Sequence, residues 1–246
     1  MLFRRLKKRE SFNFIIKERS TEHLKKKKEK MAYKGVNLYK IEKLAGLSLE
    51  NSVRLHFDSI SLFNIKAFPS SFFISVLSLE EFGKVFLLID FLYHSRVEGR
   101  MEKECEEKDI LRIFSHRHKQ YSFTYHSEIN LPRHFINMVY SGDIEIKKQN
   151  SLYVGLKKTN GKIDLKSKIT NPFKIDERKA KKQITLVNDC FLEMILGKLK
   201  GQHIIDSDTV ENLMNKSLYS LVRSKWEYTS PKVKRRLDQF EQLADF

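Results

Sequence analysis

Residues 72–90, FFISVLSLEEFGKVFLLID, place charged side chains inside an otherwise apolar run. The apolar residues recur at helical spacing, which predicts a helix that is buried over most of its surface. Glu80 and Glu81 lie on stripes of this helix that are otherwise apolar. Burying an unpaired carboxylate costs several kcal/mol. The fold must therefore bring basic groups from another helix to these two acids, or use the acids to bind something.

The two acids have a structural and a functional interpretation. In the structural one, Glu80 pairs with Lys84 one turn later, and a bridge from another helix neutralises Glu81. In the functional one, the same charges belong to a site. The geometry of this helix alone leaves both interpretations open.

The composition favours long helices joined by short loops. The 246 residues include only 9 glycines and 4 prolines, which disfavours a turn-rich all-β fold, and 41% are hydrophobic, enough for a core. Hydrophobic periodicity and capping residues predict helices over residues 40–49, 50–64, 72–93, 110–126, 131–139, 176–199, 209–226 and 231–243. The charged stretch 96–108 is typical of a solvated connection. Asp208, with Glu211 three residues later, forms the capping box expected before helix 209–226.

One β signal interrupts these helices. Asn160 and Gly161 lie between segments 151–157 and 162–168, which carry apolar residues on each side. Asn-Gly is the strongest short signal for a hairpin turn. We therefore expect a small hairpin within residues 151–168.

The positive charge is concentrated at the N-terminus. The formal net charge is +16, and residues 1–34 hold thirteen Lys or Arg and four Glu, a net of +9. Such an arm attracts phosphates through counterion release, with RNA as the main candidate, but it is also compatible with a solvated tail that binds nothing specific. The residues expected to bind RNA are Arg4, Arg5, Lys7, Lys8, Arg9, Lys25, Lys26, Lys27 and Lys28.

The cysteines and the hydropathy pattern further narrow the class of protein to which the chain can belong. Cys105 and Cys190 have no CxxC or Cys/His spacing, so they indicate neither a disulfide framework nor a zinc site, and we expect no metal and no cofactor. A reducing cytoplasm is the expected location. The longest apolar candidate, residues 85–93, is interrupted by Asp90 and is far shorter than the roughly 20 residues of a membrane span. We expect no membrane association.

A histidine-containing segment supplies the expected partners of the two acids. Arg112, His116 and Lys119 fall at i, i+4 and i+7 of the predicted helix 110–126 and share one face. A carboxylate that holds one imidazole nitrogen leaves the other available for proton transfer. The structural alternative is a polar seam in which these cations only neutralise the acids.

Four motifs in a fixed order carry a family resemblance: NSVRLHFD from Asn51, LEEFGK ending at Lys84, HRHK from His116 and SLYVG from Ser151. In this order they resemble the abortive-infection V (AbiV) family of bacterial phage-defence proteins, within the HEPN superfamily of helical nucleotide-binding and RNA-cleaving domains. The resemblance covers about residues 45–195. It implies a mainly α, HEPN-like helical bundle with a small β-hairpin insertion and extra C-terminal helices.

The expected organisation has three parts. Residues 1–34 form the basic arm, residues 35–199 the HEPN/AbiV-like helical domain with the hairpin at 151–168, and residues 200–246 the C-terminal helices that pack on the same domain.

The resemblance also implies RNA-directed toxicity. Many HEPN ribonucleases use an Arg-x(4–6)-His motif without a metal: the histidine acts on the 2′-hydroxyl or leaving group, and the arginine stabilises the phosphorane charge. Arg112 and His118 have this spacing. In an unbroken helix, however, His118 points about 120° away from Arg112, whereas His116 lies close to it. His116 is therefore the first choice as the active histidine and His118 the second.

Two functions follow. The first is a metal-independent endoribonuclease that shuts down translation on infection, acting on RNA as a homodimer and triggered by a phage-encoded activator protein. The second is a non-catalytic effector that binds a phage protein or the translation machinery, with the same residues as a structural seam. The candidate catalytic residues are Arg112, His116, His118, Lys119, Glu80, Glu81 and Lys84.

Overall fold

The computed structural model describes residues 38–97, 111–127, 131–156, 158–159, 162–199 and 207–243. The chain divides between Lys34 and Gly35 into two units, and every described residue belongs to the second unit. The basic arm at 1–34 and all but the first two residues of the connection expected at 96–108 lie outside the described residues.

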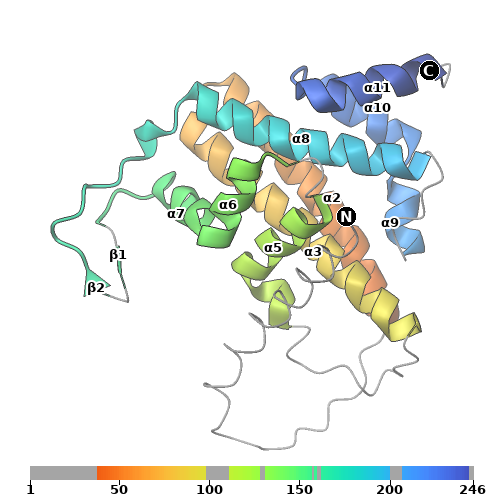
Figure 1. Cartoon of the computed structure of the whole chain (residues 1–246), viewed down its shortest axis with the longest axis horizontal. Coiled ribbons are helices and arrows are strands. Elements are labelled where there is room, and N and C mark those ends of the chain that lie inside the picture. The colour runs from red at the N-terminus through yellow and green to blue at the C-terminus, as the bar shows by residue number, and fades with distance from the viewer. Residues whose placement is uncertain are drawn as a thin grey trace, which may run out of the picture. The chain divides into compact units, whose positions relative to one another are not determined.

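Two long helices form the central hairpin of the fold (Figure 1). Helix α2 spans Leu38–Asn64 and helix α3 spans Phe68–Val97. In the short turn between them, Lys66 adopts a left-handed conformation with φ of 63°. Pro69 lies in the first turn of α3, where its missing N–H removes no helical hydrogen bond. The turn therefore returns the chain directly along α2.

Small polar residues bring α2 and α3 close together. The hydroxyl of Ser52 donates to the carbonyl of Ser78 at 2.6 Å, and the hydroxyl of Ser78 donates to the carbonyl of Ser52 at 2.7 Å. Ser71 donates to the carbonyl of Ser59 in the same way at 2.8 Å. All four serines are buried. Each of these three hydroxyls thus has a partner in the core, as buried polar groups require.

Helix α3 is the element around which the others pack. It contacts α2, α5 (His116–Ser127), α7 (Asp143–Asn150) and α8 (Glu177–Leu199). Figure 1 shows α8 crossing close to both helices of the central hairpin, in agreement with its contacts to α2 and α3. Helix α6 (Arg133–Ser141) joins α5 to α7. The prediction of a mainly α fold is confirmed.

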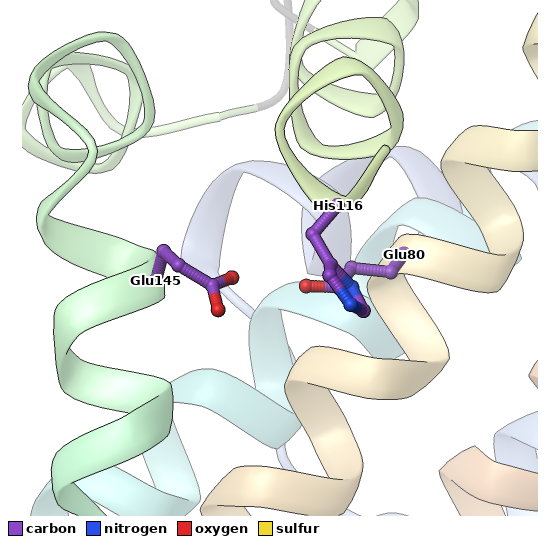
Figure 2. Close-up of side chains that lie close together, drawn as sticks. All are labelled: Glu80, His116 and Glu145. Atoms are coloured by element: carbon purple, nitrogen blue, oxygen red, sulfur yellow. The ribbon is translucent and has the colours of Figure 1, made fainter. Parts of the chain in front are cut away.

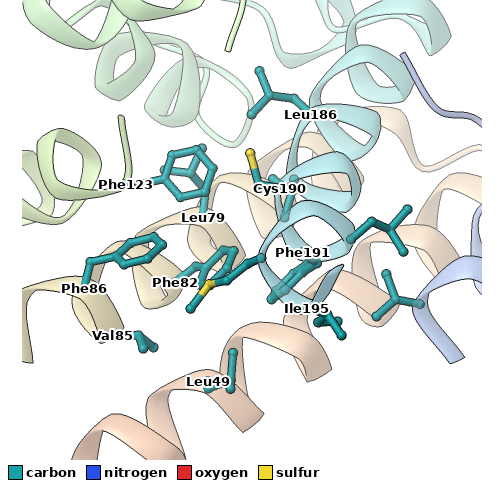
Figure 3. Packing of buried hydrophobic residues seen from close by; sticks show 14 of the residues in the cluster. Leu49, Leu79, Phe82, Val85, Phe86, Phe123, Leu186, Cys190, Phe191 and Ile195 are labelled. Atoms are coloured by element: carbon teal, nitrogen blue, oxygen red, sulfur yellow. The ribbon is translucent and has the colours of Figure 1, made fainter. Parts of the chain in front are cut away.

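Aromatic side chains form the centre of the core (Figure 3). Phe82 of α3 stacks on Phe191 of α8 with ring centroids 4.5 Å apart, and Phe123 of α5 closes the cluster at 5.8 Å from Phe82. Leu49 of α2 and Leu79 of α3 are buried in the same cluster. Four helices from distant parts of the sequence thus share one core.

A histidine is buried within this core. His56 of α2 has no exposed surface, and its Nε2 lies 2.9 Å from Oδ1 of Asn188. Burial lowers the pKa of His56 to about 4, although the hydrogen bond to Asn188 acts in the opposite direction. His56 is therefore a neutral core residue at neutral pH and has a packing role.

The C-terminal helices complete the bundle. Helix α9 (Asp208–Leu213) packs on α2, and helix α10 (Lys216–Lys225) packs on α8. Helix α11 spans Pro231–Leu243, as the sequence predicted. Val210 and Leu237 are fully buried in the same core as the central hairpin.

The single helix predicted over 209–226 is wrong. It is interrupted at Met214 and Asn215, which separate α9 from α10. The side chain of Ser207 accepts a hydrogen bond from the backbone of Val210, so Ser207 caps α9, not Asp208. Asn215 caps α10 in the same way. Residues with strong capping preference thus start two helices where periodicity indicated one.

The predicted hairpin region contains only a short pairing. Strands β1 (Lys158–Thr159) and β2 (Lys162–Ile163) are antiparallel and two residues long. Among the described residues, the strand pairing of the hairpin expected within 151–168 is limited to these four residues. The segment up to Leu156 is a turn and an extended connection, joined to Thr170 by an isolated bridge at Gly155.

Membrane insertion has no support in the described helices. None of them combines the length and apolar character needed to cross a bilayer.

Candidate functional site

The segment before α5 breaks where an unbroken helix was expected. Arg112–Phe114 form a 3-10 turn, Ser115 is extended with φ −86° and ψ 116°, and α5 begins at His116. The hydroxyl of Ser115 accepts a hydrogen bond from the backbone N–H of His118 at 3.4 Å, which is the geometry of an N-cap. The continuous helix 110–126 is therefore wrong, and Arg112 does not share a helical face with His116.

Glu80 is the centre of the candidate site (Figure 2). This carboxylate of α3 is only 1% exposed. Its Oε2 lies 2.6 Å from Nδ1 of His116. Its Oε1 accepts hydrogen bonds from Gln120 Nε2 at 2.7 Å and from Lys148 Nζ at 2.8 Å. The prediction that the histidine-containing segment reaches this acid is confirmed for His116, and both carboxylate oxygens have partners.

A second acid shares the lysine that contacts Glu80. Nζ of Lys148 lies 2.7 Å from Oε2 of Glu145, and Gln120 Nε2 donates to the same oxygen at 3.1 Å. Burial acts to raise the pKa of Glu145, but the hydrogen bond and the charge of Lys148 outweigh it and hold that pKa below its usual value. Glu145 is therefore ionised at neutral pH.

Glu81 forms a separate group with its own partners. Its Oε2 is 3.2 Å from Nζ of Lys84 and 3.3 Å from Nδ2 of Asn51, and its Oε1 is 3.7 Å from Nζ of Lys119. The pair between Glu80 and Lys84, part of the structural interpretation of the sequence, is not the one that forms, because Lys84 contacts Glu81. These contacts tie α2, α3 and α5 together.

Gly83 allows α3 and α5 to approach closely enough for these contacts. A Cβ built at Gly83 would overlap the backbone carbonyl of Lys119 and would also crowd Phe123. A side chain at this position would push α5 away from α3. The glycine of the LEEFGK motif is therefore required by the close packing of the two helices that carry Glu80 and His116.

The two candidate histidines have different environments. The side chain of His116 is 55% exposed, so Nε2 is the nitrogen that a substrate can reach while Nδ1 faces Glu80. His118 is half-buried, and burial, followed by the charges of Arg112 and Arg117, lowers its pKa. Within the described residues, its Nδ1 has no hydrogen-bond partner. Thus His116 is anchored and accessible, whereas His118 is half-buried and its pKa is lowered.

This difference changes the basis on which His116 is preferred. The expectation that Arg112 lies close to His116 and far from His118 depended on an unbroken helix. Because the chain breaks at Ser115, Arg112 lies near enough to His118 to lower its pKa. The preference for His116 now depends on its contact with Glu80.

Three atoms of the cluster have the arrangement of a cation site. One ligand atom from each of Glu80, His116 and Glu145 lies within 4.8 Å of the others. The ammonium group of Lys148 already lies between the two carboxylates, at 2.8 Å and 2.7 Å. A divalent ion would have to displace this lysine, so the cation that this cluster holds is Lys148 itself.

Sequence reasoning missed several members of the site, namely Gln120, Glu145, Lys148 and Asn51. Lys148 follows Glu145 by three positions on α7, a spacing that allows an ion pair on a helix. No helix was predicted over 143–150, because its mostly polar residues show little apolar periodicity. Gln120 directly follows the predicted Lys119, and Asn51 opens the NSVRLHFD motif.

The helical bundle, with its buried carboxylate and exposed histidine, is a HEPN-type domain, because a HEPN family profile matches it. The family profile HEPN_AbiV, described as AbiV, matches residues 40–193, and the chain belongs to this family of abortive-infection proteins in bacterial phage defence. The match includes every residue of the cluster around Glu80 and excludes the basic arm and the C-terminal helices. No match was found among curated proteins or among solved structures.

Proposed function

We propose that this protein is a metal-independent endoribonuclease that cuts RNA in the cytoplasm of an infected cell and thereby stops translation. The observation that carries the proposal is the exposed imidazole of His116, which is held through Nδ1 by a carboxylate that is itself buried and anchored. A carboxylate in this position fixes the tautomer and orientation of the ring and stabilises the imidazolium. The outward Nε2 is then the proton acceptor.

The chemistry follows from this arrangement. Nε2 of His116 removes the proton of a ribose 2′-hydroxyl, and the oxygen attacks the adjacent phosphorus. The bond from phosphorus to the 5′ oxygen breaks, leaving a 2′,3′-cyclic phosphate and a 5′-hydroxyl. The departing 5′ oxygen needs a proton from a second acid, and His116 of a second copy in a homodimer would supply it.

The remaining candidate residues divide into three roles. The charge of Arg112 acts on His118 and lowers its pKa, and Arg112 is the candidate for stabilising the phosphorane charge, as the HEPN Arg-x-His pattern implies. Lys84 and Lys119 are engaged with Glu81, and Lys119 is buried, so we assign these three residues to holding α3 against α5. His118 is the second candidate for proton transfer.

The partners of this activity are RNA, a second copy of the chain and a phage-encoded activator protein. The basic arm at residues 1–34, with Arg4, Arg5, Lys7, Lys8, Arg9 and Lys25 to Lys28, would steer RNA by long-range attraction.

A non-catalytic effector is the second candidate, and one observation favours it. Glu80, Gln120 and Lys148 are all buried, and Gln120 and Lys148 both donate to Glu80, as members of a structural seam would. In that case the exposed surface would bind a phage protein or the translation machinery, and His116 would matter only through the seam.

Incubation of the purified protein with total cellular RNA, with and without EDTA, separates the two functions. The ribonuclease predicts new ends that carry a cyclic phosphate and a 5′-hydroxyl and that form equally in EDTA. Cleavage that EDTA abolishes would contradict a metal-independent mechanism. Intact RNA in the presence of a protein that still arrests growth would favour the effector.

A further inference from the structure

Two donors and two carboxylate oxygens form a closed ring beside His116. Nζ of Lys148 lies 2.8 Å from Oε1 of Glu80 and 2.7 Å from Oε2 of Glu145. Nε2 of Gln120 donates to the same two oxygens, at 2.7 Å and 3.1 Å. These four contacts therefore close on themselves and join α3, α5 and α7 at one point. Figure 2 shows the carboxylates of Glu80 and Glu145 pointing toward one another.

Water has little access to this ring. Glu80, Gln120 and Lys148 are buried, and the side chain of Glu145 is 25% exposed. Hydrogen bonds are electrostatically stronger in such a place than in water. The amide of Gln120 turns its nitrogen to the two carboxylates although its Oε1 has no hydrogen-bond partner among the described residues. The opposite orientation would turn an oxygen toward two anions, so the two acids fix the amide.

The ring occupies one oxygen of Glu80 and leaves the other for the histidine. Both donors bind Oε1 of Glu80, whereas Oε2 contacts Nδ1 of His116 at 2.6 Å. An ammonium group has three donors and can contact both oxygens of one carboxylate. In the part of the chain that the structure describes, the carboxylates that pair with Lys148 are those of Glu80 and Glu145. Without Glu145, the lysine would be drawn to Glu80 alone and would compete with His116 for Oε2.

Glu145 is itself fixed and acts at a distance from the imidazole. Its second oxygen, Oε1, accepts a hydrogen bond from Gln149 Nε2 at 3.1 Å, so both of its oxygens have partners. Within the described ranges, no hydrogen bond joins Glu145 to His116. The hydrogen bonds that connect the two residues pass through Lys148 or Gln120 and then through Glu80.

We propose that Glu145 is a positioning residue for His116. By holding Lys148 and Gln120 against Oε1 of Glu80, it reserves Oε2 of that carboxylate for the imidazole. This role rests on the proposed ribonuclease, in which Nε2 of His116 is the base. It gives α7 a part in the reaction although Glu145 does not touch the reacting atoms.

The test compares Glu145→Leu with Glu145→Gln in the full chain. Leucine removes the acceptors, whereas the amide oxygen of glutamine can still accept hydrogen bonds from both donors of the ring. Asp143→Asn is the control, because it changes an exposed acid to an amide on the same helix but outside the ring. The values of kcat and KM are measured with an oligoribonucleotide that contains a cleavage site mapped in cellular RNA, and thermal melts give the folded fraction.

Glu145→Leu should lower kcat about 10- to 100-fold, the scale expected for a misplaced catalytic group. KM should change less than about threefold, because the ring does not bind the substrate. Glu145→Gln should retain most of the activity, and Asp143→Asn should match the parent. A role in folding alone would lower the melting temperature of Glu145→Leu and leave kcat of the folded fraction unchanged.

NMR of protein with ¹⁵N-labelled histidine tests the same role without RNA. A carboxylate that accepts from Nδ1 selects the Nδ1–H tautomer of a neutral imidazole, and the two tautomers have different ¹⁵N shifts. Of the eight histidines, His116 gives the signal that His116→Ala removes. We expect the Nδ1–H tautomer in the parent and in Glu145→Gln, and a larger share of the Nε2–H tautomer in Glu145→Leu.

Parental kcat or parental His116 shifts in Glu145→Leu would overturn the proposal, since Glu145 would then not act through the imidazole. Equal losses in Glu145→Leu and Glu145→Gln would also overturn it, because the negative charge and not the ring would matter. If the parent protein cleaves no RNA, the proposed ribonuclease fails, and the ¹⁵N shifts alone decide whether the ring positions His116.

Discussion

His116 on α5 and Glu80 on α3 are 36 residues apart in the sequence, yet Nδ1 of the imidazole lies 2.6 Å from Oε2 of the carboxylate. The second oxygen of Glu80 is held by Gln120 and Lys148, so the carboxylate cannot rotate without breaking these bonds. The ring of His116 is consequently oriented by a rigid buried anion while its outer edge remains at the surface.

We expect His116→Ala to abolish RNA cleavage and growth arrest in infected cells while the protein stays folded, because the ring is exposed and is the proposed base. His118→Ala should do less. The measurements are the extent of RNA cleavage, cell growth after infection and a thermal melt.

A matched control exists for this substitution. His126 on the same helix contacts Asp90 of α3 at 3.0 Å, so it is a second histidine–carboxylate pair between the same two helices. His126→Ala should retain activity. If the His116→Ala protein melts near the parent temperature and still arrests growth, the ribonuclease with His116 as base is refuted. An inactive His118→Ala protein would keep the ribonuclease and change the histidine.

Replacement of Lys148 by methionine should destabilise the protein by about 3–5 kcal/mol, because it leaves two carboxylates without their shared cation in a buried site. The quantity to measure is the free energy of unfolding in urea. The double variant Glu80→Gln/Lys148→Met should lose less stability than the two single variants together, since the glutamine amide at position 80 is uncharged. Lys147→Met is the neighbouring control. Additive losses would show that Lys148 and Glu80 do not interact.

Substitution of Gly83 by alanine should lower the free energy of unfolding by about 1–3 kcal/mol. The new methyl group overlaps the carbonyl of Lys119 and separates α3 from α5. Gly155→Ala is the control, since the nearest atom to its Cβ, Oγ1 of Thr170, is 3.9 Å away. That variant should stay within about 0.5 kcal/mol of the parent. Equal stability of the two alanine variants in chemical denaturation would exclude the close packing at Gly83.

The buried His56 should make the protein less stable as the pH falls. The pKa of His56 is about 4 in the folded protein, below the ordinary histidine value of 6.5. Between these values the unfolded chain binds more protons, so stability decreases on acidification. This residue lowers the free energy of unfolding by about 2 kcal/mol between pH 7 and pH 5. Asp189 acts in the opposite direction, because burial raises its pKa to about 6.

The non-titrating variant His56→Gln isolates this contribution. The difference in unfolding free energy between the parent and the variant should shift against the parent as the pH is lowered from 7 to 5. A difference that is constant over this range would show that His56 is protonated equally in both states.

Deletion of residues 1–34 should weaken binding to RNA and reduce its dependence on salt, because this segment carries +9 of the +16 formal charge. The remaining chain should stay folded, since residues 35–246 form a compact unit of their own. Affinity is measured over a range of salt concentrations. An unchanged affinity and salt slope would exclude the arm from RNA binding.

The sequence by itself determined the central relationship of the site. The helix that contains Glu80 and Glu81 is apolar on several faces, and carboxylates on such a helix require partners whatever the fold. The basic residues that follow at His116 and Lys119 were the evident complement, and each of them reaches one of the acids. The mainly α fold was predictable for the same reason, because apolar periodicity is a local property of the chain.

Only the tertiary structure decided which charge meets which. A lysine three or four residues after two adjacent acids can pair with either of them. Lys84 contacts Glu81, and Glu80 pairs with Lys148, which lies 68 residues away in the sequence. The break at Ser115 was equally undecided, because the same serine can continue a helix or cap a new one. In the structure Ser115 caps a new helix, and Ile113, just before the break, is buried. Local spacing sets which contacts are possible, and the packing of distant helices selects among them.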